Sequence, residues 1–442
     1  MASSGSLLAF RGGKPVRSRP WPRWPRSERS TEKAVTQVLR SERWTISGPC
    51  TKGPPFERRF AEAFAALHGV PYCVPTANGS AALTISLEAL GVGPGQEVLV
   101  PGLTWVACGS SVARLGAIPV LVDVDPRTLC MSVAAARNAI TPATTAIILV
   151  HLYCTLADFE AFGDLAATTG IPLVEDCSHV HGAAWRGRRV GTFGALGVFS
   201  MQQTKVLTSG EGGAVITSDA RLYDRLQQLR ADGRRYTAHR RLGAPELEPV
   251  GTVQGHNYCL SELHAAVLCD RLPHLDEENT IRRKNATYLT ERLRQLEGVW
   301  PLHEIRADCR PTFYRYCLRL DLKRLSDVPI EVVASALTAE LRIPVQVIYD
   351  PLNANPLFDP RQSSRRPQTK DLARLYDPSR FPLPVSAAAR RECVGVPHNT
   401  LLGGRREVAD IAAAFEKLLD HHGELLTLAP RQRGASRCAT KD

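Results

Sequence analysis

The stretch FSMQQTKVLTSGEGGAV, residues 199–215, joins two apolar runs through a segment rich in Ser, Gln and Thr. The two runs have the composition of buried strands, and Gly-Glu-Gly-Gly at 210–213 predicts a tight turn before the second one. Lys205 lies between the runs, and burial disfavours the charged form of an amine. Three roles are open for it: a solvated charge, a phosphate ligand, or an amine that forms a covalent bond. The apolar residues on both sides of Lys205 disfavour the first role.

Helix and strand patterns alternate along the chain around this stretch. Helical periodicity is found at residues 31–42, 54–69, 79–91 and 158–170, and Gly69 is expected to end the second of these helices. Short β-branched runs are found at 96–102, 119–125, 146–153, 171–177, 196–201 and 212–218. This alternation predicts an α/β fold with a parallel sheet covered by helices on both faces.

The order of elements changes after about residue 290, where a strand at 313–322 and helices at 327–342 and 406–422 predict a smaller α+β domain. A chain of 442 residues is too long for one ordinary core, so two domains are expected. The expected parts are an arm at 1–30, a large domain at 31–290, a small domain at 291–430 with a long loop at 353–385, and a basic tail at 431–442.

Composition excludes several classes of protein. The net charge of +11 is spread along the chain without a nucleic-acid-binding motif, so no nucleic-acid partner is expected. No run of about 18 apolar residues and no secretory h-region is found, which indicates a cytoplasmic protein without a membrane partner. The 12 cysteines are scattered singly, so neither a metal site nor a redox pair is expected.

Polar residues that can carry chemistry follow several of the predicted strands, where open α/β sheets bind their ligands. Gly79 and Ser80 open a helix and offer backbone N–H groups to an anion, although simple capping by Asn78 or Ser80 explains them equally well. Asp176 follows an apolar strand, either as a helix cap or as the counter-charge of a cationic ligand atom. Asn257 precedes a helix, where capping is again an alternative.

Taken together, these residues match the needs of pyridoxal phosphate. This cofactor needs a lysine for a Schiff base, an acid beside the ring nitrogen, a phosphate site at a helix N-terminus and a ring that stacks on the pyridine. Lys205, Asp176, the Gly79–Ser80 pair and Trp105 supply these groups in turn. The sequence therefore predicts a pyridoxal phosphate enzyme with Lys205 and Asp176 as its catalytic residues.

The same motifs resemble the DegT/DnrJ/EryC1/StrS sugar aminotransferase family, which has the type I fold of aspartate aminotransferase. The resemblance rests on residues 78–105, 115–125, 174–183, 198–217 and 255–266. It implies a large domain with a mixed, mostly parallel seven-stranded sheet and a smaller α+β C-terminal domain. It also implies a PLP-dependent aminotransferase that works as a homodimer.

The resemblance assigns roles residue by residue. Lys205 matches the Schiff-base lysine and Asp176 the partner of the ring nitrogen. Ser200, together with Gly79 and Ser80, matches the phosphate ligands. His179 stands where the family has Gln or His near the cofactor's 3-oxygen, and Asn257 where an Asn reaches the phosphate of the other subunit.

Six segments are most similar to glutamine-dependent scyllo-inosose and 2-deoxy-scyllo-inosose aminotransferases: residues 8–25, 150–162, 200–214, 351–358, 377–386 and 394–403. The Gln-Gln pair at 202–203 narrows the resemblance to these enzymes. These enzymes aminate a keto-cyclitol in aminoglycoside biosynthesis, so L-glutamine and a keto-cyclitol are the implied substrates. Alternatives are an aminotransferase for nucleotide-linked keto sugars, an enzyme similar to 3-amino-5-hydroxybenzoate synthase, and a non-catalytic regulatory member of the family. The chain departs from the family pattern at Cys154, where Gly is usual, and at His256 and Cys259.

The wall of a site for a polyhydroxylated ring should be polar. We expect six residues to contribute to it, each of which also has an ordinary structural explanation: Thr45, Ser47, His151, Tyr153, Tyr349 and Asn353.

Overall fold

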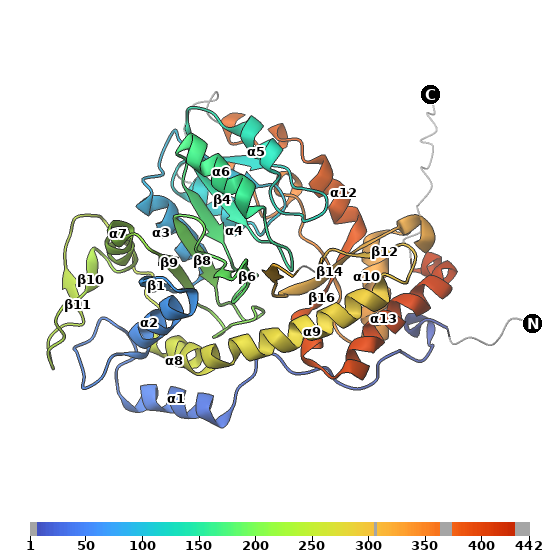
Figure 1. Ribbon diagram of the computed structural model, residues 1–442, viewed down its shortest axis with the longest axis horizontal. Helices are drawn as coiled ribbons and strands as arrows, with labels where there is room; N and C mark the ends of the chain where they lie inside the picture. The colour runs from blue at the N-terminus through green and yellow to red at the C-terminus, as the bar shows by residue number, and fades with distance from the viewer. Residues whose placement is uncertain (1–6, 305–306, 363–373, 429–442) are drawn as a thin grey trace, which may run out of the picture.

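The computed structural model of the protein describes residues 7–304, 307–362 and 374–428 (Figure 1). The expected basic tail at 431–442 and the middle of the expected loop at 353–385 lie outside the described residues. Among those residues, no helix is both long and apolar enough to cross a membrane.

The central sheet has seven strands in the order β1-β9-β8-β5-β4-β2-β3. Strand β9 is antiparallel to both of its neighbours, and the other strands all run in one direction. The predicted mixed, mostly parallel sheet is therefore confirmed. The bounds are β1 Tyr72–Thr76, β2 Glu97–Pro101, β3 Ile118–Val122, β4 Thr144–Val150, β5 Leu173–Asp176, β8 Leu196–Ser200 and β9 Gly213–Thr217.

Successive residues of the central strands point to opposite faces of the sheet, and each face has its own core. Val198 and Val215 belong to one buried cluster, whereas their neighbours Phe199 and Ile216 belong to another. Helix α3 (Gly79–Ala89) covers the first face, and helices α2 (Phe56–His68) and α8 (Glu262–Arg271) pack together on the second. The sheet is thus covered by helices on both faces, which explains why the sequences of its strands are nearly continuous apolar runs.

Four helices of this part, α1, α2, α3 and α6, match the periodic segments predicted at 31–42, 54–69, 79–91 and 158–170 closely. Asn78 caps α3 by accepting a hydrogen bond from the Ala81 N–H at 2.8 Å, and Gly69, with a φ of 69°, ends α2. The bounds are α1 Arg29–Arg40, α2 Phe56–His68, α3 Gly79–Ala89, α4 Ala107–Arg114, α5 Val133–Ala139, α6 Phe159–Thr169, α7 Ala220–Arg230, α8 Glu262–Arg271 and α9 Leu275–Leu293.

A second, antiparallel sheet of four strands lies beyond the long helix α9, in the order β12-β14-β16-β15. Helices α10 and α13 pack against each other beside it, and α13 also packs on α9 (Figure 1). The bounds are β12 Val299–Pro301, β14 Arg315–Leu320, β15 Gln346–Val347, β16 Cys393–Pro397, α10 Ile330–Leu341, α12 Pro384–Glu392 and α13 Arg405–Asp420. The division of the chain into a large and a small domain at residue 290 stays a prediction.

Two small sheets complete the fold. A hairpin of β10 Arg234–Tyr236 and β11 Leu247–Pro249 projects beyond α7 (Figure 1), and β13 Cys309–Arg310 pairs with β6 Ala184–Trp185, which pairs with β7 Arg188–Arg189. The β13–β6 pairing joins the chain that follows α9 to the loop that follows Asp176.

The N-terminal arm crosses from one sheet to the other. Figure 1 shows it running from α1 toward α13, and Arg17 on the arm forms ion pairs with Glu407 at 2.7 Å and Asp410 at 2.9 Å. The Trp21 indole N–H donates to the Leu341 carbonyl at 2.7 Å. The arm is therefore an integral part of the packing around α10 and α13.

A fully buried ion pair joins α2 to α7. Glu57 and Arg230 both have no exposed side-chain surface and contact each other, and the Tyr236 hydroxyl donates to the same carboxylate. Burying two charges removes both from water, so the loss of one partner leaves the other with an uncompensated desolvation cost.

We expect Glu57→Ala to lower the free energy of unfolding of the apo-protein by about 3–5 kcal/mol, since Arg230 would remain buried without its partner. Urea titration measures this change. Glu62→Ala on the same helix is the control, because the Glu62 side chain is exposed and its pair with Arg58 is worth less than about 0.5 kcal/mol. Equal losses in the two variants would contradict the role given to the buried pair.

Candidate active site

A cavity of about 660 Å³ opens at the edge where the parallel strands of the large sheet end. Most of the residues predicted for the cofactor and part of the predicted substrate wall line it: Gly79, Ser80, Trp105, His151, Asp176, His179, Ser200, Lys205 and Tyr349. Their convergence follows from topology, since strands that run in one direction end at one edge of the sheet.

Lys205 is buried, with 8% of its surface exposed. Its Nζ lies 4.2 Å from the centre of the Tyr314 ring, and no described carboxylate lies within ion-pair distance of it. Burial lowers the pKa of the Lys205 amine, although Tyr314 and Asp176 partly oppose the shift. A buried amine with a lowered pKa is what a nucleophile or base requires near neutral pH, so the structure disfavours a solvated surface charge.

The loop that carries Lys205 is fixed by backbone hydrogen bonds. The Lys205 N–H donates to the Gln202 carbonyl at 2.8 Å, and the Met201 N–H donates to the Gly212 carbonyl at 2.8 Å. Gly210 and Gly212 have φ values of 91° and 151°, which other residues rarely adopt. The predicted turn before β9 is therefore confirmed.

Two aromatic rings from distant parts of the chain hold the backbone at the lysine. The Trp24 indole N–H donates to the Lys205 carbonyl at 3.1 Å, and the His398 Nε2 lies 3.2 Å from the Thr204 carbonyl. The Trp24 and His398 rings pack edge to face, with their centres 4.6 Å apart. The N-terminal arm thus contributes directly to the position of Lys205, which the sequence did not indicate.

The start of α3 and the end of β8 touch each other and form a cradle for an anion. A Cβ atom on Gly79 would lie 2.6 Å from the Ser200 Cβ, so only glycine fits there. The Asn78 side chain accepts a hydrogen bond from the Ala81 N–H. The N–H groups of Gly79 and Ser80 lie in the first turn of α3, where backbone N–H groups have no partner within the helix. Ser80 is exposed toward the cavity. Backbone N–H groups and two hydroxyls of this kind suit a phosphate.

Asp176 is the last residue of β5 and lines the cavity. One carboxylate oxygen accepts the Ser178 N–H at 3.0 Å, and the other accepts the Cys108 S–H at 3.3 Å. No helix begins at Asp176, so capping does not explain it. Burial and the Asp176 charge raise the pKa of the Cys108 thiol well above its ordinary value, which keeps it a donor. Cys108 was not among the predicted site residues, since a single cysteine carries no sequence signal for this contact.

An aromatic cluster forms the wall beyond Lys205. The His179 ring stacks on the Tyr314 ring at 4.1 Å, accepts the Tyr153 N–H at Nδ1 and places Nε2 3.4 Å from the Tyr349 hydroxyl. Burial, and then the Lys205 charge, lower the pKa of His179 well below its ordinary value, so the ring is neutral. His179 therefore presents a stacked, oriented imidazole to the cavity, and its position near the cofactor's 3-oxygen stays a prediction.

His151 lines the cavity, but both of its ring nitrogens are occupied. Nδ1 accepts the Ala157 N–H at 3.2 Å and Nε2 lies 3.4 Å from the Glu175 carboxylate. Glu175 and Cys177 lie close enough to His151 to share a metal ion, yet Glu175 already accepts the N–H groups of Gly191 and Gly194. These contacts support a structural role for His151, and its predicted contact with substrate stays a prediction.

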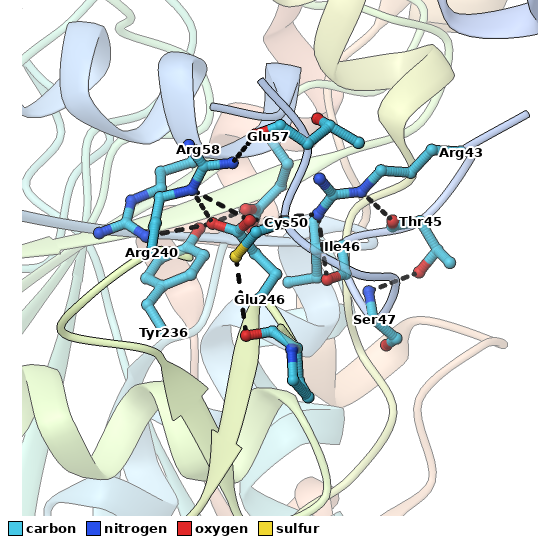
Figure 2. A network of polar contacts seen from close by, with 12 residues as sticks. Arg43, Thr45, Ile46, Ser47, Cys50, Glu57, Arg58, Tyr236, Arg240 and Glu246 are labelled. Atoms are coloured by element: carbon cyan, nitrogen blue, oxygen red, sulfur yellow. Dashed lines mark hydrogen bonds and ion pairs between the residues drawn. The ribbon is translucent and has the colours of Figure 1, made fainter. Parts of the chain in front are cut away.

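Several predicted substrate residues do not line the cavity in this chain. Figure 2 shows Thr45 and Ser47 beside a network in which Arg43, Arg58 and Arg240 surround the buried Glu246. The Asn353 amide donates to the Phe381 carbonyl at 3.0 Å, and the buried Tyr153 hydroxyl accepts the Tyr349 N–H at 2.8 Å. Their roles as substrate contacts stay predictions.

Asn257 is exposed and does not cap the helix that follows it, because Ser261 caps α8. Among the departures from the family pattern, Cys154 is buried, Cys259 is half-buried, and His256 pairs with Glu88 at 3.0 Å. Asn257 is thus displayed on the surface, where another subunit could be reached.

The sequence did not point to Tyr314 and Arg315, which also line the cavity. Arg315 is the first residue of β14, a strand of the second sheet, and Tyr314 directly precedes it. In sequence they belong to an ordinary strand pattern, FYRYCLRL, and only the packing of the two sheets brings them to Lys205.

The sequence of this chain is similar to that of one known protein family. The family model of the DegT/DnrJ/EryC1/StrS aminotransferases matches residues 25–394. The chain belongs to this family of PLP-dependent aminotransferases. The predicted family and enzyme class are therefore confirmed.

The chain is similar to curated relatives over almost its whole length. It is 49% identical over 423 residues to the L-glutamine:2-deoxy-scyllo-inosose aminotransferase of Streptomyces fradiae. That alignment covers 96% of this chain and 100% of the relative. It is 47% identical over 425 residues to the L-glutamine:scyllo-inosose aminotransferase of Streptomyces griseus, and that alignment covers 95% of this chain and 99% of the relative.

A solved structure confirms the predicted fold. The crystal structure of 3-amino-5-hydroxybenzoic acid synthase aligns with a TM-score of 0.77 at 30% identity, covering 92% of this chain and 100% of that one. The type I α/β fold predicted from the motifs is thus shown.

The residues around the cavity fit pyridoxal phosphate. The contact between Gly79 and Ser200 leaves a cradle of N–H and hydroxyl donors for a phosphate, while Asp176 and Lys205 line the same cavity. Trp105 is 48% exposed and faces this space, so its ring is available for stacking.

Gly79→Ala should weaken pyridoxal phosphate binding by about tenfold or more, because the added methyl group would push the start of α3 away from Ser200. Titration of the apo-protein with the cofactor, followed through the visible Schiff-base absorption, measures the affinity. Gly163→Ala is the control, since a Cβ there meets nothing within 4 Å. Unchanged affinity in the Gly79 variant would show that the cradle does not bind the phosphate.

Proposed function

We propose that the chain is a PLP-dependent aminotransferase that transfers the amino group of L-glutamine to a keto-cyclitol, scyllo-inosose or 2-deoxy-scyllo-inosose, in aminoglycoside biosynthesis. The observation that carries the proposal is the buried Lys205 amine, which shares one cavity with Asp176 and the Gly79–Ser200 cradle. Relatives that are nearly half identical over their full length support the substrate pair.

Each cavity residue has a chemical task in this proposal. Gly79, Ser80 and Ser200 hold the phosphate, and Asp176 holds the ring nitrogen in its protonated form. Trp105 would stack on the pyridine ring, and the neutral imidazole of His179 would lie near the cofactor's 3-oxygen.

Pyridoxal phosphate supplies a carbon that exchanges amines and a ring that accepts electrons. Lys205 would do the proton chemistry: its free amine would take the proton from the donor's α-carbon, hold it at Nζ and later give it up again. Its lowered pKa favours the neutral amine that this step needs. The Trp24 and His398 contacts keep its backbone fixed while the side chain moves.

Lys205→Ala should lose the visible Schiff-base absorption and all amination, because no other lysine lines the cavity among the described residues. The exposed Lys323 gives the control variant Lys323→Ala, which should keep both. The assay supplies L-glutamine with scyllo-inosose, 2-deoxy-scyllo-inosose, a dTDP-linked keto sugar or aminodehydroshikimate.

The panel of acceptors tests the proposal against its alternatives. Amination of the dTDP-linked sugar or reaction of aminodehydroshikimate, without turnover of either inosose, would replace the proposed substrate. A wild-type protein without Schiff-base absorption in the presence of the cofactor would point to a non-catalytic member of the family.

We also propose that the enzyme is a homodimer in which Asn257 completes the neighbouring site. Its exposure and its freedom from capping support this assignment. Asn257 comes just before Tyr258, which lines the cavity of its own chain, so the segment lies at the cavity rim.

A mixture of Asn257→Ala and Lys205→Ala chains tests the shared site. Neither variant alone should be active, but mixed dimers contain one site with both residues intact. Equal mixing after unfolding and refolding should restore about a quarter of wild-type activity, as expected for random pairing of two chains. No recovery, with mixed dimers verified by mass, would show that Asn257 serves its own subunit.

A further inference from the structure

Arg315 places a second cation beside the reactive lysine. It is the first residue of β14 and lines the cavity. Its Cζ lies 5.3 Å from the centre of the Tyr314 ring, and the Lys205 Nζ lies 4.2 Å from the same ring. The guanidinium and the amine thus flank one aromatic ring inside the cavity.

The guanidinium has no acidic partner in the part of the chain that the structure describes. Arg319, four residues along the same strand and therefore on the same face, pairs with Glu392 at 3.4 Å. The other acidic residues of the cavity are Asp176, which already accepts two hydrogen bonds, and the exposed Glu211. An unpaired cation held in a cavity is suited to an anionic ligand.

The path of the Arg315 side chain is fixed by its neighbour in the sheet. Gly395 on β16 pairs with Cys317, and a Cβ atom on Gly395 would lie 3.1 Å from the Arg315 Cδ and 3.2 Å from the Cys317 Sγ. The missing side chain at 395 lets the arginine lie across the neighbouring strand toward the cavity. The cation is therefore positioned by the sheet and not by a flexible loop.

We propose that Arg315 binds the α-carboxylate of the amino donor, and this rests on the function proposed above. The donor nitrogen must reach the carbon that Lys205 vacates, and its α-carboxyl carbon lies only about 2.5 Å from that nitrogen. A guanidinium beside Lys205 can then hold the carboxylate with two parallel N–H···O bonds. This leaves the donor's α-proton facing the Lys205 amine.

The acceptor has no carboxylate that needs a cationic partner. A keto-cyclitol is neutral, so its binding gains nothing from a cation, and the two half-reactions should depend on Arg315 differently. Arg114, the other arginine of the cavity wall, is exposed and lines a neighbouring cavity as well, so it does not flank the Tyr314 ring.

Arg315→Gln tests the proposal in the holoenzyme, with each half-reaction followed separately through the cofactor's absorption. In this variant kcat/KM for L-glutamine should fall by about 100-fold, mainly because KM rises. Arg315→Lys should lower kcat/KM by about tenfold only, because lysine keeps the positive charge but lacks the two parallel N–H donors of the guanidinium. The half-reaction of the aminated enzyme with the keto-cyclitol should change less than about threefold. Arg319→Gln is the matched control on the same strand and should leave both half-reactions near wild type.

A binding measurement complements the kinetics. Calorimetric titration with the monoamide of glutaric acid, which has the carboxylate and amide of glutamine but no amino group, should show binding to wild type and loss of binding in Arg315→Gln. Retention of the Schiff-base absorption and the melting temperature verifies that the variant is folded.

Unchanged donor kinetics in Arg315→Gln, or equal losses in both half-reactions, would overturn the proposal. So would a wild-type enzyme that accepts amines without a carboxylate as readily as L-glutamine. If wild type reacts with L-glutamine but with neither inosose, the proposed acceptor fails while the role of Arg315 is still decided by the donor half-reaction.

Discussion

The site depends on one desolvated amine. Lys205 is buried without an acidic partner in ion-pair distance among the described residues, and its Nζ lies over the face of the Tyr314 ring. That placement is unfavourable for an ammonium ion and favourable for a neutral amine. The surrounding structure maintains it through hydrogen bonds to the loop backbone, the glycine turn before β9 and the aromatic wall of Tyr314 and His179. The cradle and Asp176 then place cofactor-binding groups around that amine.

Most of the large sheet could be predicted from sequence because its strands are buried on both faces. Runs such as those of β4 and β8 are apolar throughout, and the glycine or polar residues at their ends mark where each strand stops. The two-residue strands β6, β7 and β13 were missed, since so short a segment has no periodicity. Pairing between them is set by tertiary contact instead of local pattern.

The residues of the site likewise fall into those that the sequence predicted and those that it did not. Lys205, Asp176, Ser200 and Gly79 were predicted because they follow strands of one sheet in a recognisable order, and all of them line the cavity. Cys108, Tyr314 and Arg315 have no such signal: they reach the site through packing between distant elements. Thr45 and Ser47 were expected there on polarity alone, and the arginine network around Glu246 holds their segment elsewhere. Polarity identifies candidates, whereas only topology brings residues together.

The contact between Trp24 and the Lys205 carbonyl has a consequence for how the protein matures. The arm is synthesised before the loop of Lys205, yet Arg17 on the arm is anchored by Glu407 and Asp410 on α13, which is synthesised about 200 residues after that loop. The loop of Lys205 therefore acquires this support only after α13 has been made. A nascent chain has the nucleophile before it has these contacts to hold it, so the cofactor is best loaded once α13 is in place.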